Sequence, residues 1–265
     1  MQTIQRNQDN RGVLTLHMDR PTVHNAFDAD MIRELTGVLQ AAEQNADVRL
    51  LVITGTGTCF SAGADLNWMR RQVTASRAEN ERDALTLAKL LRTLNYLSKP
   101  TIARINGAAF GGGLGLLAAC DITIAADTAL FGVTETRLGL VPAVISPYVC
   151  RRIGERYARR YFLTGERFDS QQALAIGLVQ QCVAAEDLDS AVNTATEDLI
   201  KGAPLAVTHA KRLVFKVAGH DEQSQESQDA YTAKLIADLR ISAEGQEGLT
   251  AFLEKRKPVW VSEFE

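Results

Sequence analysis

A glycine-rich turn decides the fold of this chain: Asn106-Gly-Ala-Ala-Phe-Gly-Gly-Gly-Leu-Gly115. A strand-like run, residues 101–105, precedes the turn, and the apolar residues 114–119 predict a buried helix after it. Three consecutive glycines at such a turn leave backbone N–H groups unshielded by any Cβ, at the positive end of a helix dipole. The turn therefore predicts a site that stabilises negative charge on an oxygen.

Two further segments would complete an apparatus for making an enolate. The segment Cys59-Phe-Ser-Ala-Gly-Ala-Asp65 follows an apolar strand and offers a second bare N–H, although Asp65 could equally cap the next helix. Glu135 stands among apolar residues, where desolvation raises the pKa of a carboxyl group into the range that suits proton transfer. The alternative for Glu135 is a surface glutamate paired with Arg137. The glycine turn twenty residues upstream favours the acid/base role.

Other chemistries fit these motifs less well. The glycines could simply allow a helix to pack closely on a strand, but they lack the G-x-G-x-x-G spacing of a dinucleotide site. No Gly-Lys-Ser/Thr follows to form a phosphate-binding loop. Ser61 has no nearby histidine and no G-x-S-x-G elbow occurs, which argues against a serine hydrolase.

The composition is that of an ordinary soluble globular protein. The 265 residues are 46% hydrophobic and 23% charged, and the net charge of −3 gives no electrostatic footprint for nucleic acid. The four cysteines are scattered without a C-x-x-C pair, so neither a zinc site nor a disulfide framework is expected. The first residues lack the apolar core of a signal peptide, and no apolar run reaches membrane-spanning length. We expect a cytoplasmic protein without a bound metal.

Hydrophobic periodicity predicts an α/β core followed by helices. Residues 1–200 are expected to form the core and residues 201–265 a helical C-terminal region. In the core, the strand–turn–helix units suggest either stacked ββα turns or a parallel sheet. The predicted strands are 12–18, 48–54, 101–105, 122–126, 130–132 and 178–183. The predicted helices are 31–42 (capped by Asp28 or Asp30), 77–97, 114–119, 148–163, 170–176, 187–201, 204–217, 223–239 and 244–257.

These motifs and several others occur in the order typical of one family, and the chain resembles the crotonase (enoyl-CoA hydratase/isomerase) superfamily. The similarity spans nearly the whole chain. The matching stretches are Asn25-Ala-Phe27, Phe60-Ser-Ala-Gly-Ala-Asp-Leu66, Lys99-Pro-Thr-Ile-Ala-Arg-Ile-Asn-Gly107, Gly111-Gly-Gly113, Cys120-Asp-Ile122, Phe131-Gly-Val-Thr-Glu135, Leu138-Gly-Leu140 and Ala251-Phe-Leu-Glu-Lys-Arg-Lys-Pro258.

The resemblance implies a spiral of ββα units with a C-terminal helical trimerisation region, assembled as a homotrimer or a hexamer. It implies an acyl-CoA substrate, with coenzyme A as part of the substrate and no further cofactor. The oxyanion-hole amides fall on Ala64 and Gly112, and Glu135 is the catalytic acid/base. The substrate-binding residues implied by the resemblance are Val23, Ala26, Phe27, Ser61, Ala62, Asp65, Leu66, Trp68, Gly111, Pro142, Phe252 and Lys255.

One position departs from the two-glutamate hydratases of the family. Those enzymes carry a glutamate directly after the glycine turn, where this chain has Gly115. A single glutamate is also typical of the Δ3,Δ2-enoyl-CoA isomerases of the family, so isomerisation stays an alternative. The dehalogenase branch places a nucleophilic aspartate at the position of Ala143, which excludes that activity.

Similarity to one branch favours hydration. The stretches 138–148, 151–156 and 161–168 resemble the bacterial 3-methylglutaconyl-CoA and isohexenylglutaconyl-CoA (γ-carboxygeranoyl-CoA) hydratases, which act in leucine and acyclic-terpenoid degradation. Such substrates carry a second carboxylate, which Arg137 or Arg70 could bind. The sequence therefore predicts an acyl-CoA hydratase. A non-catalytic acyl-CoA-binding or RNA-binding relative is a remote alternative, supported only by a modest basic patch around residues 151–160.

Overall fold

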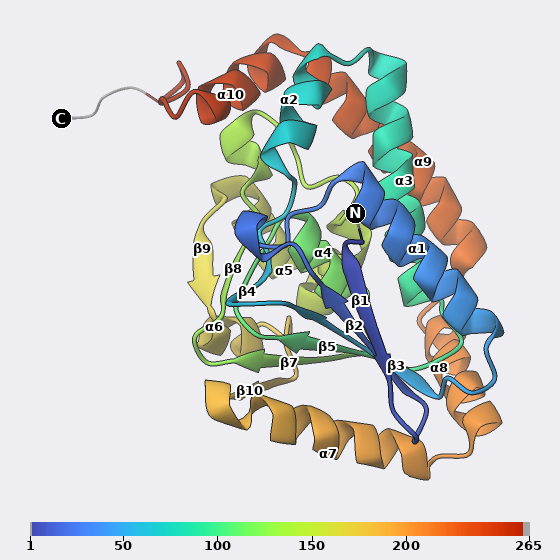
Figure 1. The fold of residues 1–265 in the computed structure, drawn as a ribbon. Coiled ribbons are helices and arrows are strands. Elements are labelled where there is room, and N and C mark those ends of the chain that lie inside the picture. The colour runs from blue at the N-terminus through green and yellow to red at the C-terminus, as the bar shows by residue number, and fades with distance from the viewer. Residues whose placement is uncertain (1, 262–265) are drawn as a thin grey trace.

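Two β-sheets form the centre of the protein, as seen in a computed structural model that describes residues 2–261 (Figure 1). The larger sheet has the strand order β1-β2-β3-β5-β7-β10, and the smaller sheet has the order β4-β6-β8-β9. The larger sheet comprises β1 (Ile4–Gln8), β2 (Val13–Met18), β3 (Leu50–Gly55), β5 (Thr101–Ile105), β7 (Ile122–Ala126) and β10 (Gln181–Val183). The smaller comprises β4 (Cys59–Ser61), β6 (Ala108–Phe110), β8 (Leu130–Gly132) and β9 (Arg167–Asp169).

From β3 to β8, successive strands alternate between the two sheets, and this alternation makes the fold a spiral. The chain passes from β3 to β4, from β5 to β6 and from β7 to β8, placing one strand in each sheet per turn. Neighbouring turns pair in parallel, as in the register of Ile53 with Ala103 and of Ala109 with Phe131. Every residue of β3 is buried, which explains its continuous apolar run. The predicted α/β spiral of ββα units is confirmed.

The helices cover the outside of the sheets, with α1 and α3 on one side and α7 beneath the larger sheet (Figure 1). Helix α1 begins after Asp28, whose side chain accepts a hydrogen bond from Met31 N at 2.9 Å. The apolar residues of its inner face, which follow helical spacing in the sequence, are all buried: Met31, Ile32, Leu35, Val38, Leu39 and Ala42. The helices are α1 (Ala29–Gln44), α2 (Leu66–Thr74), α3 (Arg77–Asn95), α4 (Gly112–Ala118), α5 (Ser146–Thr164), α6 (Ser170–Ala175), α7 (Leu188–Lys201), α8 (Pro204–Val217), α9 (Glu222–Ile241) and α10 (Ala243–Leu253), with short 3₁₀ turns η1 (Pro21–Val23), η2 (Glu135–Leu138) and η3 (Ala185–Asp187).

The C-terminal helices pack against the core rather than standing apart from it. Helix α9 runs along α3, and α10 lies against α2 (Figure 1). Lys211 Nζ of α8 lies 2.8 Å from Asp121 Oδ2, an ion pair that joins this helix to the core. The predicted division into a core of residues 1–200 and a separate C-terminal region of residues 201–265 stays a prediction. In residues 2–261, no helix combines the length and the hydrophobicity that crossing a membrane would need.

Helices α4 and α5 approach one another closely at Gly115. A Cβ at this position would lie 2.2 Å from Ile145 Cγ2 and 2.8 Å from Ile145 Cβ, with Leu91 Cδ1 at 3.5 Å. The space that a side chain at 115 would need is therefore already filled by apolar groups. Gly115 is required for packing, whatever else it does for the chemistry.

This packing predicts that Gly115→Ala lowers the free energy of unfolding by about 2 kcal/mol, because the added methyl overpacks a buried contact. Gly37→Ala is the matched control, since no atom lies within 4 Å of a Cβ in that exposed part of α1. The control should gain up to about 1 kcal/mol from helix propensity. Urea denaturation of both variants and of Gly115→Ala/Ile145→Ala measures the effect. Unchanged stability of Gly115→Ala would contradict the close contact.

Candidate active site

A cavity of about 360 Å³ lies between the glycine turn, the end of β4, η2 and the helices α2, α9 and α10. Its wall is largely apolar and contains most of the residues that the sequence predicted for the site. The predicted residues that line it are Phe27, Ala62, Ala64, Trp68, Gly111, Gly112, Glu135, Pro142 and Phe252. The structure therefore brings the two predicted amides and the predicted carboxyl group to one cavity.

The N–H of Ala64 is turned away from the neighbouring chain segment. Phe27 and Ala64 form an isolated parallel bridge, in which Phe27 N donates to Gly63 O at 2.6 Å and Asp65 N donates to Phe27 O at 2.8 Å. Because alternate residues of an extended segment point to opposite sides, the N–H of Ala64 faces away from Phe27. No residue in the described part of the chain accepts a hydrogen bond from it.

The glycine turn lies directly beside this loop. A Cβ at Gly63 would be 3.0 Å from Phe110 O and 3.7 Å from Gly112 N, and a Cβ at Gly112 would be 2.9 Å from Phe27 Cδ2. Gly111 has φ 47° and donates its N–H to Gly132 O at 3.2 Å. The Gly112 N–H, in contrast, finds no acceptor within residues 2–261. A side chain at Gly63 or Gly112 would push the glycine turn away from the Ser61–Asp65 loop and Phe27.

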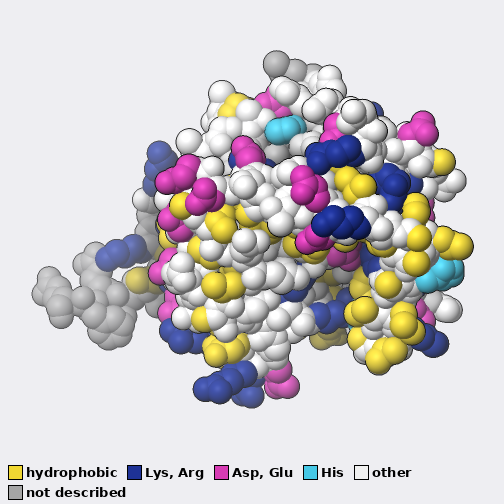
Figure 2. Space-filling model, turned by 90° about the horizontal axis from the view of Figure 1, so that it is seen from below, with side chains coloured by type: hydrophobic (Ala, Val, Ile, Leu, Met, Phe, Trp, Pro, Cys, Tyr) yellow, Lys and Arg dark blue, Asp and Glu magenta, His cyan; other side chains and the backbone are white. Residues whose placement is uncertain are grey.

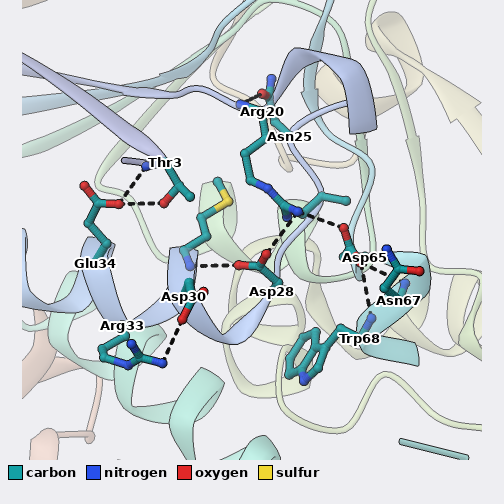
Figure 3. Close-up of polar contacts among 12 residues, drawn as sticks. Thr3, Arg20, Asn25, Asp28, Asp30, Arg33, Glu34, Asp65, Asn67 and Trp68 are labelled. Carbon is teal, nitrogen blue, oxygen red and sulfur yellow. Dashed lines mark hydrogen bonds and ion pairs between the residues drawn. The ribbon is translucent and has the colours of Figure 1, made fainter. Parts of the chain in front are cut away.

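An ion-pair cluster fixes the loop that carries Ala64 (Figure 3). Arg20 Nη2 lies 2.9 Å from Asp65 Oδ2 and 3.0 Å from Asp28 Oδ2. Asp65 Oδ1 also accepts the backbone N–H groups at the start of α2, as predicted for a helix cap. Burial opposes ionisation of Asp65, but these N–H groups and the Arg20 guanidinium hold the pKa of this carboxyl below its ordinary value. Asp65 is thus part of the scaffold.

The two segments are also joined by uncharged hydrogen bonds. Asn25 Nδ2 donates to Cys59 O at 2.8 Å and to Thr56 O at 2.9 Å, and Ser61 Oγ donates to Asn25 O at 2.8 Å. Both side chains are fully buried. The Asn-Ala-Phe motif therefore holds the Ser61–Asp65 loop in place, so that the Ala64 N–H is set before any ligand arrives.

Some of the predicted substrate-binding residues lie outside the cavity wall. Ser61 and Asp65 are occupied by the contacts just described, and Ala26 is buried beside them. Val23 and Leu66 are exposed, at 37% and 49%. Lys255 is exposed as well, with φ 57°. The binding roles of these residues stay predictions.

Glu135 reaches into the cavity from η2, directly beneath the glycine turn. Its Oε1 would lie 3.3 Å from a Cβ at Gly111, and its Oε2 is buried with no hydrogen-bond partner in residues 2–261. Burial raises the pKa of Glu135 to about 7. The described residues show no ion pair between Glu135 and the exposed Arg137, so the surface-pair alternative is wrong. A carboxyl group of this kind can both take and return a proton near neutral pH.

Glu135 is the sole acidic residue in the described wall of the cavity. Ala143 lines the wall as well, and Ile145 fills the space beside Gly115, so no second carboxylate replaces the absent one. Gln72 and Arg240 also line the cavity, and the sequence analysis missed both. A signal for Arg240 did exist, because it continues the buried stripe Ala233, Ile236 and Ala237 of α9 at helical spacing.

Comparison with known proteins identifies the family. Residues 8–263 match the model of the enoyl-CoA hydratase/isomerase family. The 2,3-dehydroadipyl-CoA hydratase of Escherichia coli is 32% identical over 93% of this chain and 94% of its own length. The short-chain-enoyl-CoA hydratase of Clostridium acetobutylicum is 30% identical over 92% of both chains. The crystal structure of an enoyl-CoA hydratase from Shewanella pealeana superposes with a TM-score of 0.80 at 43% identity, covering 98% of this chain and 96% of its own. The chain belongs to the enoyl-CoA hydratase/isomerase family of enzymes, the crotonase superfamily.

Proposed function

We propose that the enzyme adds water across the α,β double bond of an acyl-CoA thioester, with Glu135 as its single acid/base. The observation that carries this proposal is the combination of three unsatisfied groups at one cavity. The N–H groups of Ala64 and Gly112 lack acceptors, and Glu135 Oε2 lacks a donor, within residues 2–261. Two donors and one carboxyl group are what an enolate intermediate requires.

The two amides would bind the thioester oxygen as it gains negative charge. Losing one such donor typically costs about 10²–10³ in rate. In hydration, the Glu135 carboxylate takes a proton from the water that attacks the β-carbon and then returns that proton to the α-carbon. In dehydration, Glu135 removes the α-proton and returns it to the departing hydroxide. The scheme uses no group beyond the protein and the thioester, so no further cofactor is proposed.

Coenzyme A would enter along the segments 23–27 and 61–65, which meet at the Phe27–Ala64 bridge. Phe252 of α10 lines the cavity and is 46% exposed, which suits a contact near the entrance. Trp68 and Pro142 lie in the buried part of the wall and would contact the acyl chain. Exposed Lys255 follows α10 and would bind the nucleotide end.

For the acyl group, we propose a chain of the methylglutaconyl or isohexenylglutaconyl type. The stretches 138–148, 151–156 and 161–168 support this choice through their resemblance to hydratases of that kind. The Escherichia coli relative is also named for a substrate, 2,3-dehydroadipyl-CoA, that by its name derives from a dicarboxylic acid. Of the arginines suggested for the second carboxylate, Arg70 is exposed and donates to Asn67 Oδ1, while Arg137 lines the cavity at its exposed side.

Isomerisation is the second candidate, and the packing at Gly115 favours it. Ile145 occupies the place beside Gly115, so the second carboxylate of a two-glutamate hydratase has no space there. A Δ3,Δ2-enoyl-CoA isomerase needs one carboxylate alone, which removes a proton from C2 and returns it to C4. Glu135 meets that need.

We propose a homotrimer or a dimer of trimers for the assembly. Helix α8 supports it, because its exposed apolar side chains gather toward one edge of the molecule (Figure 2). These side chains are Leu205, Leu213, Val214 and Val217. On the same face of Figure 2, basic and acidic side chains are intermingled and form no basic stripe, which does not favour RNA.

Product analysis tests the activity with 3-methylglutaconyl-CoA, crotonyl-CoA and 3-hexenoyl-CoA. We expect water to be added to the first two thioesters, which chromatography detects as 3-hydroxyacyl-CoA. Turnover of 3-hexenoyl-CoA alone, by migration of the double bond, would replace the hydratase with an isomerase. Binding of all three without any turnover would indicate a non-catalytic acyl-CoA-binding protein.

The pKa of Glu135 predicts the pH dependence. Only the ionised carboxyl group accepts a proton, so kcat/KM should rise with pH and level off above about 7. Glu135→Gln should lower kcat by about 10²–10⁴ and abolish the rise of kcat/KM with pH. Because folding raises this pKa, the free energy of unfolding of the wild-type protein should fall as the pH rises from about 4.5 to about 7. Above that range, the Tm of Glu135→Gln should exceed the Tm of the wild-type protein. Activity of Glu135→Gln near the wild-type level would remove Glu135 from its proposed role.

A further inference from the structure

Two buried polar groups in the cavity wall have no function in the scheme above. Gln72 of α2 is 3% exposed, and its Nε2 has no hydrogen-bond partner within residues 2–261. Arg240, near the end of α9, likewise has a buried Nε without an acceptor. Both groups line the same cavity as Glu135. A buried donor left unpaired costs free energy, so such a pair calls for an acceptor.

Asn80 connects these two residues. Arg240 Nη1 makes only long contacts, 3.3 Å to Asn80 O and 3.4 Å to Asn80 Oδ1. Asn80 Nδ2 in turn donates to Gln72 O at 3.2 Å and to Ala75 O at 3.2 Å, and Asn80 is fully buried. Asn80 therefore links α2 to Arg240 of α9, while Arg240 Nε and Gln72 Nε2 have no acceptor within residues 2–261.

No acidic side chain in the described part of the chain forms an ion pair with Arg240. Asp83 is near enough to act on its charge, but Asp83 Oδ2 already accepts the indole N–H of Trp68 at 3.0 Å. Burial lowers the pKa of Arg240 to about 10, so the guanidinium is still charged at neutral pH. The guanidinium of half-buried Arg240 therefore has a buried Nε and no direct ion-pair partner among residues 2–261, and an anionic group on a ligand would offset the cost of its desolvation.

The other arginines of the cavity wall are engaged elsewhere or exposed. Arg256 pairs with Glu247 at 2.6 Å and with Glu254 at 2.8 Å. Arg167 is exposed and lies over the ring of Phe110, 5.0 Å from its centroid. Much of the rest of the cavity wall is apolar. The apolar residues there include Trp68, Met69, Ile236 and Leu249, all of them buried.

We propose that Arg240 and Gln72 bind a carboxylate at the far end of the acyl chain, so that the enzyme selects acyl-CoA thioesters of dicarboxylic acids. A planar guanidinium forms two parallel hydrogen bonds to a carboxylate, and the amide of Gln72 supplies a third donor. The apolar wall accommodates the carbon chain between this pair and the thioester. The inference rests on the proposed function for the placing of the thioester at Ala64 and Gly112 and for the second carboxylate of the acyl chain. It deepens that proposal by assigning the carboxylate to Arg240 and Gln72.

Binding of saturated thioesters tests the inference without requiring turnover. The probes are glutaryl-CoA with pentanoyl-CoA and adipyl-CoA with hexanoyl-CoA, pairs that match in carbon number and differ in the terminal carboxylate. In isothermal titration calorimetry, the wild-type protein should bind the dicarboxylic member of at least one pair more tightly. Arg240→Met should lower this preference by about 10- to 100-fold, since a charge-assisted hydrogen-bonded pair is lost.

The controls separate recognition of the carboxylate from damage to the fold. Arg240→Lys should retain part of the preference, because it keeps the charge and loses the planar fork. Gln72→Leu should lower the preference by about threefold to tenfold, and it carries the test if Arg240→Met does not fold. Arg159→Met, an exposed arginine of α5, should leave the preference unchanged. No preference in the wild-type protein, or a preference that survives in both cavity variants, would overturn the inference. If the enzyme does not hydrate its substrates, the product analysis would show this, and the ratio of affinities for dicarboxylic and monocarboxylic thioesters would be unaffected.

Discussion

The pairing of Phe27 with Ala64 is the constraint on which the site depends. It uses the backbone groups of Phe27, Gly63 and Asp65 and leaves the N–H of Ala64 directed the other way. The Arg20 ion pairs fix the same loop from outside the cavity. Folding therefore orients the free N–H before a ligand binds. A preorganised donor of this kind stabilises charge most effectively.

The electrostatics of the cavity follow from how few charges it contains. No basic residue among residues 2–261 pairs with Glu135, so burial is the dominant influence on its pKa, and the carboxyl group is poised between its two protonation states near pH 7. Arg240 lies in the same wall on a different element of the fold, and its Nε has no acceptor within residues 2–261. In our proposal the two residues have separate functions: Glu135 moves a proton and Arg240 recognises a charge. Had they formed an ion pair with one another, neither would be available.

Much of the fold could be predicted from sequence, because the spacing of apolar residues in a long amphipathic segment indicates which of its faces is buried. Helix α1 shows this, since its cap at Asp28 and its whole inner face were identified. The strands β1, β4, β6 and β9 were missed. Strands β4, β6 and β9 have three residues each, which are too few to show a period, and β1 buries only Ile4 and so lacks an apolar alternation. The motifs predicted which residues meet at the cavity. The spacing along α9 places Arg240 on the buried face of this helix, but the cavity it lines depends on α2 and α3, which are remote in sequence and could not be placed beside it.

The contact of Ile145 with Gly115 also bears on how such an enzyme changes over time. A carboxylate could occupy position 115 only if residue 145 became smaller, because the two claim the same space. The first substitution alone brings a clash, and the second alone leaves a void, so each intermediate is less stable than either endpoint. Mutational paths from this sequence to a two-glutamate relative are therefore epistatic. Steric exclusion at this contact therefore opposes a second carboxylate in this chain.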